Sequence, residues 1–482
     1  MKVQLIYPPL IPGEKPRYGL QPLGVLYLAT SLERRGIEVG VIDGEIEGLT
    51  VDEIVQRIAA SGADLIGISA MTPQLPVAFA IARQVKSLGR DIRTCLGGSH
   101  ANATLDESLS LSPDLDFVIY GEGEYSLWEL CSKPEKHHWH LVEGLIYRDD
   151  TGKIIKNKPR AFIPDIDELN PLNCKLLDMT SYSMPYLPGK NVASMIISRG
   201  CPYHCSYCDA YISQGRKLRL RSPLLIVEEI KSIMQDFGIR HFSFKDSTFT
   251  LDRNHTLEFM KEIQRNALNI SWRCNSRVDR VDPDLLREMK KAGCHMILFG
   301  VESGSQTILD TLQKGTTVEQ AIEALRMTRE TGIKTYASFM LGNPGETPET
   351  AQQTINLAKK LDPDIAIFFS TIAYPGTTIY SDALRDNLVQ KQWWHPRHYQ
   401  GEERSFAKWI SSKGGTLKIA GFDHARWIKK AFREFYFRPR FILRAMRETL
   451  CNPSYLWVVL SLLPNLTSFL LRKKQAPMEE RT

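Results

Sequence analysis

The chain has 482 residues, of which 43% are hydrophobic and 24% charged, and its net charge is +6. This composition excludes a disordered, collagen-like or purely membrane protein, and the length predicts two or three domains. Between Phe422 and Lys474, eleven Lys and Arg face three Asp and Glu, so this segment carries +8 and the rest of the chain −2. Because the basic excess belongs to the C-terminal region, it argues against a general nucleic-acid binder.

Cysteine usage and the first residues both favour a cytoplasmic protein. Three of the nine cysteines crowd into eight residues and the other six are scattered, which is not the pattern of a disulfide scaffold. The opening MKVQLIYPPL lacks a charged start followed by a long apolar run. A strand is therefore expected there rather than a signal peptide.

The first third of the chain alternates short apolar runs with segments of helical spacing. Strands are expected at Lys2–Tyr7, Glu38–Asp43, Leu65–Ala70, Arg93–Gly98 and Phe117–Gly121, and helices at Pro22–Gly36, Val51–Ala60, Pro73–Leu88 and Ala101–Leu111. This order predicts an open, doubly wound parallel sheet, whose ligands bind beyond the carboxyl ends of the strands. Each glycine at those ends could simply turn the chain, but as a set they favour a site. The set is Gly67, Gly97, Gly98, Gly121 and Gly123.

A second alternating series follows a predicted hairpin and linker. Its strands are expected at Ala193–Ser198, His241–Asp246, Ile270–Ser276, Met296–Ser303, Lys334–Leu341 and Ile365–Thr371, and its helices at Pro223–Phe237, Asn254–Asn266, Pro283–Ala292, Val318–Thr331 and Thr347–Leu361. Six such units predict a partial (β/α)6 barrel of the TIM type, with catalytic groups at the carboxyl ends of its strands. The predicted α/β chain thus has a Rossmann-like domain (1–140), a hairpin and linker (141–191), the partial barrel (192–383) and a helical C-terminal region (384–482).

The most specific motif lies just after the first barrel strand. From Ser198 to Asp209 the chain reads SRGCPYHCSYCD, which spaces Cys201, Cys205 and Cys208 as C-x3-C-x2-C. Three thiolates this close can bind three corners of a 4Fe–4S cluster and leave the fourth iron open. The alternatives are chance and a zinc site, but structural zinc takes four ligands, commonly from paired C-x2-C units.

This stretch resembles the signature of the radical S-adenosylmethionine (SAM) superfamily, including Tyr207 before the last cysteine. The resemblance implies that the open iron chelates SAM, which one electron cleaves to a 5′-deoxyadenosyl radical. It also implies that Asp246, in Phe244-Lys-Asp-Ser247, meets the SAM amino group, although the usual Gly-Gly-Glu is absent. Glu302 would face the ribose, with an ion pair to Arg277 as the alternative, and Gly342 would lie near the adenine.

The N-terminal part resembles the cobalamin-binding domain that precedes many radical SAM barrels. The resemblance rests on the segments QPLGVLYLA from Gln21, GGSHA from Gly97 and GEGE from Gly121. It implies cobalamin contacts from Ser69, Thr72, Gly97, Gly98, His100, Gly121 and Gly123. The Asp-x-His-x-x-Gly motif that supplies a cobalt ligand is absent, so bound cobalamin is expected with its nucleotide tail off cobalt and no histidine in its place. The alternative is a domain that has lost the cofactor.

Together the two resemblances imply a cobalamin-dependent radical SAM methyltransferase acting on an unactivated carbon of a small molecule. Its electrons would come from a flavodoxin- or ferredoxin-type donor, and no nucleic acid is expected as a partner. A cyclase or rearrangement enzyme with the same cofactors is the main alternative, and a non-catalytic cobalamin or redox sensor is another. No residue is assigned a catalytic role beyond cofactor binding.

The C-terminal tail raises one further expectation. Residues 422–474 mix aromatic and apolar side chains with basic ones, and the apolar run Tyr455–Leu471 is short for a spanning helix and broken by Pro464 and Asn465. Such a segment suits peripheral contact with an anionic membrane at the inner face, and with it a lipophilic substrate. The alternative is that its helices cap the barrel.

Overall fold

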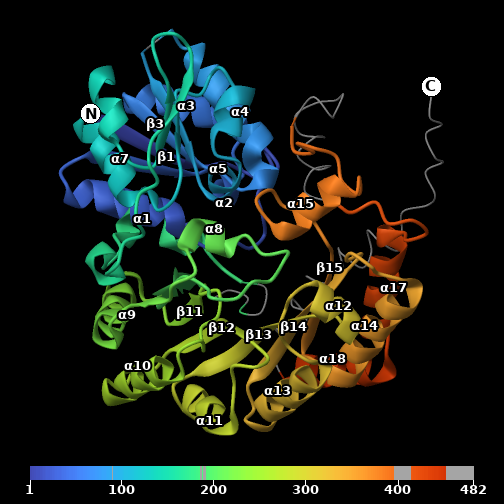
Figure 1. Cartoon of the computed structure of the whole chain (residues 1–482). Helices are drawn as coiled ribbons and strands as arrows, with labels where there is room; N and C mark the ends of the chain where they lie inside the picture. Colours follow the sequence, from blue (N-terminus) through green and yellow to red (C-terminus); the bar gives the residue numbers. More distant parts are fainter. Residues whose placement is uncertain (90, 185–186, 188–190, 396–413, 452–482) are drawn as a thin grey trace.

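The computed structural model describes residues 1–482 except 90, 185–186, 188–190, 396–413 and 452–482. Two α/β units, each built on a parallel sheet, account for most of the described chain, and a set of C-terminal helices packs beside the second unit (Figure 1).

The first sheet has seven strands in the order β2-β1-β3-β4-β5-β6-β7. Their bounds are β1 Lys2–Tyr7, β2 Glu38–Asp43, β3 Leu65–Ser69, β4 Arg93–Gly97, β5 Phe117–Ile119, β6 Leu145–Arg148 and β7 Ile154–Lys156. The first five are parallel, as predicted. The predicted hairpin is β6 and β7, and it extends this sheet because β6 pairs antiparallel with β5.

Helices cover both faces of this sheet, which confirms the doubly wound prediction. On one face α1 (Leu23–Arg34) packs with α7 (Gly123–Ser132), and on the other α3 (Val51–Ser61) packs with α4 (Leu75–Lys86). Short helices follow β2 and β4: α2 (Gly44–Glu47), α5 (Ser99–Thr104) and α6 (Asp106–Leu111). The single helix expected from residue 101 to 111 is interrupted because Leu105 adopts φ +53°. Helix α7 was not among the predicted helices.

The predicted linker is packed between the two units. It contains three short 3₁₀ helices, η3 (Ile166–Leu169), η4 (Cys174–Leu176) and η5 (Met179–Ser181). Tyr182 donates a buried hydrogen bond to Asp43 of the first sheet (2.7 Å). Gln21 joins the first unit directly to the second, donating to the carbonyl of Val192 (2.8 Å) and accepting from the amide of Ser194 (2.9 Å).

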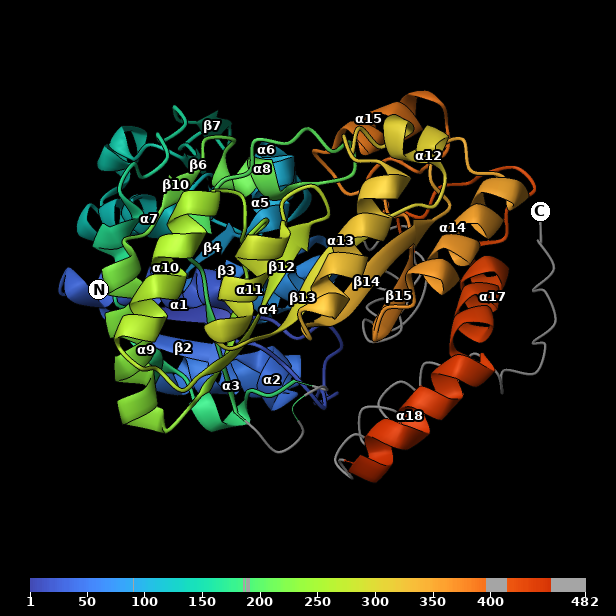
Figure 2. The same ribbon diagram turned by 90° about the horizontal axis from the view of Figure 1, so that it is seen from below.

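The second sheet has six parallel strands in the order β15-β14-β13-β12-β11-β8. The strands are β8 Val192–Met195, β11 His241–Phe244, β12 Ser271–Arg277, β13 Cys294–Glu302, β14 Lys334–Leu341 and β15 Ile365–Ser370, and the helices between them are α9 Pro223–Phe237, α10 Arg253–Arg265, α11 Pro283–Lys291, α12 Gln306–Thr311, α13 Val318–Glu330 and α14 Pro348–Leu361. The long helices cover one face of the sheet (Figure 2). The predicted partial barrel is therefore confirmed.

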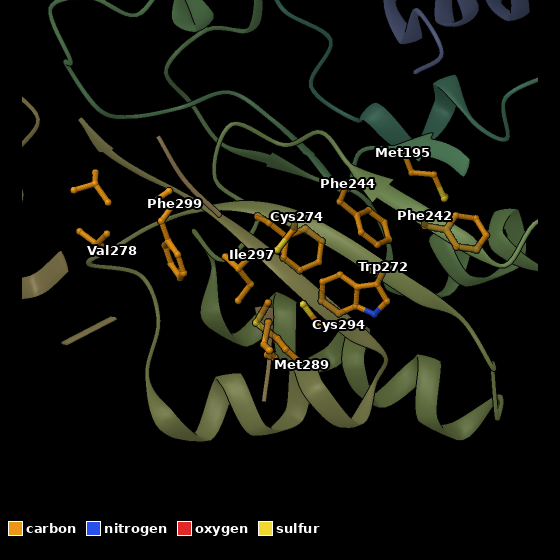
Figure 3. Close-up of a cluster of buried hydrophobic side chains, with 14 of the residues drawn as sticks. Met195, Phe242, Phe244, Trp272, Cys274, Val278, Met289, Cys294, Ile297 and Phe299 are labelled. Atoms are coloured by element: carbon orange, nitrogen blue, oxygen red, sulfur yellow. The ribbon is translucent and has the colours of Figure 1, made fainter. Parts of the chain in front are cut away.

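The core of the second unit lies between that face and the helices. Phe242 and Phe244 of β11 and Trp272 and Cys274 of β12 point to this side, where they meet Met289 of α11 (Figure 3). All five side chains are at most 1% exposed. Alternate residues of these strands therefore point to the opposite, inner face of the sheet.

The C-terminal helices complete the packing. Helix α15 (Thr378–Arg385) lies against the first unit, whereas α17 (His424–Tyr436) packs on α14 and β15 and leads to α18 (Pro439–Cys451). Phe432 and Phe435 of α17 contact Phe368 of β15. Helix α17 thus caps the barrel, which is the alternative that the sequence left open for this part of the tail.

Candidate functional site

The three cysteines of the motif lie in one loop whose base is tightly constrained. The loop follows the two-residue strand β9 (Ser198–Arg199), and the amide of Cys201 donates to the carbonyl of Gly215 (3.1 Å). Gly200 has φ +96°, and a Cβ there would lie 2.2 Å from the carbonyl oxygen of Lys217. Only glycine fits this position, so the chain reaches Cys201 by a close backbone crossing that a side chain would block.

The thiols of the loop are accessible and close enough to affect one another. Cys201, Cys205 and Cys208 are half-buried, whereas the other described cysteines are buried. Burial, with smaller contributions from the charges of Asp209, Cys205 and Cys201, raises the pKa of Cys208 to about 11. The described residues contain no group of three His, Cys, Asp or Glu spaced for a single metal ion. Three thiols on one loop fit the three protein-bound irons of a cubane cluster. The sulfur atoms that bind such a cluster are further apart than sulfur atoms that bind a single metal ion.

Behind the loop, Arg277 supplies positive charge. Its guanidinium donates to Cys205 Sγ at 3.9 Å, lies 3.6 Å from the ring centroid of Tyr203 and forms an ion pair with Asp279 at 2.8 Å. A cation at this distance stabilises thiolate charge. Arg277 does not pair with Glu302, the alternative that the sequence left open.

Glu302 instead forms a buried triad with Lys314 and Tyr207. The Lys314 ammonium donates to Glu302 Oε1 (2.9 Å) and to the Tyr207 hydroxyl (3.0 Å), and that hydroxyl donates to the same carboxylate oxygen (3.1 Å). Glu302 ends β13 at φ +67°, a conformation that the triad helps to hold. Burial first, and then the Glu302 charge, raise the pKa of Tyr207 well above its usual value. The triad brings together Glu302, predicted to face the SAM ribose, and Tyr207 of the cluster motif.

Asp246 is buried at the end of β11 and retains an unused acceptor. Its Oδ1 accepts hydrogen bonds from the Ile197 amide (3.0 Å) and the Ser198 hydroxyl (2.6 Å), and Oδ2 has no partner among the described residues. Burial raises the pKa of Asp246 to about 6. An orphaned carboxylate oxygen two residues beyond a barrel strand fits an ammonium group such as that of SAM.

Gly342, the predicted adenine neighbour, permits a close approach by the C-terminal region. It has φ +79°, and a Cβ there would lie 2.0 Å from the ring of His424, the first residue of α17. The residue therefore has a packing requirement of its own, and its contact with adenine stays a prediction.

A cavity of about 540 Å³ lies between the carboxyl edge of the first sheet and the barrel. Its lining includes five residues predicted to contact cobalamin, which are Ser69, Gly97, Gly98, Gly121 and Gly123. Gly98, at φ +92°, has no room for a Cβ, which would lie 2.8 Å from the backbone of Ala70. From the barrel side, Asp209, Ser213 and Gln214, which directly follow the cluster loop, line the same cavity. A glycine-lined edge that a large planar ligand can approach fits the predicted cofactor.

His100 and Thr72 do not line this cavity. His100 is 0% exposed, its Nδ1 lies 3.0 Å from the Thr72 hydroxyl, and its ring packs edge-on against Trp394. Burial lowers the pKa of His100 to about 3, so the imidazole is neutral. The structure places this pair in the packing between the first unit and the segment after the barrel. Their contact with cobalamin stays a prediction.

A buried ion-pair network, which the sequence analysis missed, connects the two sites. Arg199, two residues before Cys201, pairs with Glu122 (2.9 Å) and Glu124 (2.7 Å), and Arg219 also pairs with Glu122 (2.7 Å). Burial alone would lower the pKa of Arg199, but Glu124 and Glu122 raise it above its ordinary value. The guanidinium also lies 4.6 Å from the ring of Tyr27. The sequence signals for this network were Glu122 and Glu124 in the segment GEGE and Arg199 in the cysteine motif.

Comparisons with known proteins agree with this geometry. The family model of the radical SAM superfamily matches residues 195–358, and that of the B12 binding domain matches residues 10–130. The chain belongs to the radical SAM enzymes that carry a B12-binding domain, and its cofactors are a 4Fe–4S cluster, SAM and cobalamin.

Two relatives and one solved structure show which enzymes of this class the chain is similar to. An uncharacterized methyltransferase of Pyrococcus horikoshii is 32% identical over 93% of this chain and 95% of its own length. An anaerobic magnesium-protoporphyrin IX monomethyl ester cyclase of Rubrivivax gelatinosus is 30% identical over 75% of this chain and 66% of its own length. Among solved structures, the radical SAM methyltransferase TsrM of Kitasatospora setae with cobalamin and a 4Fe–4S cluster shares the fold, with a TM-score of 0.69, 18% identity and coverage of 91% of this chain and 90% of TsrM.

Proposed function

We propose that the protein is a cobalamin-dependent radical SAM methyltransferase that methylates an unactivated carbon of a small molecule. The observation that carries the proposal is a cavity shared by the two units. Residues that follow the cluster loop form one of its walls, and the glycine-lined edge of the B12-binding domain forms the opposite wall. When bound, the cluster and SAM supply hydrogen-atom abstraction and cobalamin supplies a transferable methyl group. The methyltransferase relative from Pyrococcus horikoshii supports this choice over cyclisation.

The chain's own residues have separate tasks in this proposal. The three loop cysteines hold the cluster, the free Oδ2 of Asp246 accepts from the SAM amino group, and Glu302 faces the ribose. Because Glu302 is already bound to Lys314 and Tyr207, its carboxylate is oriented before SAM arrives. A flavodoxin- or ferredoxin-type protein would reduce the cluster.

The decisive experiment is anaerobic reconstitution with iron, sulfide and cobalamin, followed by incubation with methyl-labelled SAM and fractionated cell extract. A methyltransferase transfers the label to a new compound while 5′-deoxyadenosine accumulates. A cyclase or rearrangement enzyme forms 5′-deoxyadenosine and an altered product without label. A sensor does neither, so this assay separates the three functions.

The proposal also includes peripheral membrane contact, within a cytoplasmic protein, through the part of residues 422–474 that follows α17. Of the described helices, none is long and apolar enough to cross a membrane. Exposed Leu443, Met446 and Leu450 lie along one side of α18, with exposed Arg440 and Arg447 close by. The apolar run 455–471 lies outside the described residues. Salt-sensitive flotation with anionic liposomes, lost on removal of residues 437–482 from a chain that stays folded, would support the contact, and no flotation at low salt would exclude it.

A further inference from the structure

The inner face of the barrel sheet carries different side chains at its two sides. Because Phe242 and Phe244 of β11 point into the outer core (Figure 3), Ser243 between them points inward. Lys245, the residue directly after β11, lines the interdomain cavity. The same alternation turns Arg273 of β12 inward. The side formed by β11 and β12 is therefore cationic.

Lys245 is the basic residue of that side that reaches the interdomain cavity. Its side chain is exposed to the cavity and makes no hydrogen bond or ion pair with a described residue. Desolvation by the surrounding protein, and then the nearby Arg273 charge, lower its pKa to about 8. An ammonium that faces a cavity and has no counter-ion is available to bind an anion.

The other charged groups of the cavity do not meet this requirement. Five charged residues line it: Glu122, Glu124, Arg199, Asp209 and Lys245. The first two pair with Arg199. Asp209 forms no ion pair with Lys245. The cavity therefore presents one cation without a protein partner among the described residues.

The opposite side of the inner face is apolar. Ala366 and Phe368 of β15 belong to the outer core, so Ile367 and Phe369 point inward, and Phe369 is 51% exposed. On β14 the same alternation turns Met340 inward. Four strand spacings separate β11 from β15, or about 19 Å measured along the sheet. A ligand that contacts both sides must be elongated and amphipathic.

We propose that Lys245 binds the anionic group, a carboxylate or phosphate, of an amphipathic substrate whose apolar part lies along the inner faces of β14 and β15. The substrate carbon to be methylated then lies between the anionic anchor and the apolar wall. This inference rests on the proposed methyl transfer for its functional meaning, but the binding site itself can be tested without turnover.

The binding test uses decyl phosphate, decanoate and decanol as probes of the reconstituted full chain, measured by titration calorimetry. Wild-type protein is expected to bind one of the two anions about 10- to 100-fold more tightly than decanol, the range of one charge-assisted hydrogen bond. The anion that binds more tightly identifies phosphate or carboxylate. The preference should disappear in Lys245→Met, persist in Lys245→Arg, and persist in the control Lys261→Met, which changes an exposed lysine of α10.

Two further readouts separate this inference from the proposed function. SAM affinity and cobalamin content should be the same in Lys245→Met as in wild type; a tenfold loss of either would assign the lysine to a cofactor and overturn the inference. The inference is also overturned if decanol binds as well as the anions, or if Lys245→Met keeps the preference. In the labelled-methyl assay, label is expected in compounds retained by an anion exchanger. If the anion preference depends on Lys245 but no compound gains label, the site stands and methyl transfer fails.

Discussion

Arg199 joins the strand before the cluster loop to the cobalamin domain by two buried ion pairs, and its replacement should weaken the contact between the two units. In Arg199→Met the apolar part of the side chain is kept and the guanidinium is lost. Glu122 keeps Arg219, but Glu124 is left without an ion pair among the described residues. The side chain of Glu124 is only 5% exposed, so water replaces the lost partner only in part.

The expected cost follows from that burial. Removing one partner of a buried ion pair typically destabilises a protein by about 3–5 kcal/mol, because the remaining charge is left unpaired. The loss of the contact with the Tyr27 ring adds to this in the same direction. The double variant Arg199→Met/Glu124→Gln leaves no unpaired charge there, so it should recover part of the loss.

Urea unfolding of the unreconstituted protein, followed by circular dichroism, measures both effects. Arg326→Met is a suitable control, since the ion pairs of Arg326 are with exposed glutamates on the surface of α13. Exposed ion pairs add little stability, so the urea midpoint of this variant should stay at the wild-type value. The reasoning is refuted if Arg199→Met unfolds at the wild-type urea concentration, or if the double variant is less stable than the single one.

Four other predictions concern the loop cysteines, His100 and Gly98. Replacing any one of the loop cysteines by alanine should abolish cluster absorbance and SAM cleavage, whereas buried Cys274→Ala should keep the cluster; a full cluster in a loop variant would contradict the assignment. The absorbance spectrum of bound cobalamin should show the nucleotide tail off cobalt and be the same in His100→Ala, and a changed lower ligand would show that His100 binds cobalt. Burial lowers the pKa of His100 in the folded protein to about 3, so on acidification the unfolded chain binds a proton at this residue before the folded protein does. The free energy of unfolding should therefore fall as the pH drops from about 6.5 towards 3, by up to about 1.4 kcal/mol per pH unit. In His100→Gln the urea midpoint should fall less steeply over this range, and a pH profile identical to that of wild type would contradict the prediction. Gly98→Ala should lower both stability and cobalamin content, since its Cβ would meet the backbone of Ala70, and normal cobalamin loading would show that the edge can move.

Local patterns were sufficient to predict the parallel strands of both sheets, their order along the chain and the loop that contains the three cysteines. Alternation of apolar and polar residues identifies a strand such as β11 without knowledge of its neighbours, and three cysteines within eight residues must lie together in any fold. The same reasoning failed at Leu105, where a single residue with positive φ divides a helix, because propensity does not register such a break. It also treated the hairpin as separate from the first sheet, since pairing between β5 and β6 depends on where the strands meet.

The sequence by itself determined the class of enzyme and predicted the cluster ligands, because both depend on short, contiguous segments. Only the tertiary structure decided the partners of the charged residues. Glu302 pairs with Lys314 rather than Arg277, Arg199 reaches a glutamate 75 residues away, and Lys245 is left without a partner among the described residues. Ion pairs over such separations depend on which elements the fold brings into contact, and burial then determines how strongly each unpaired charge requires a ligand.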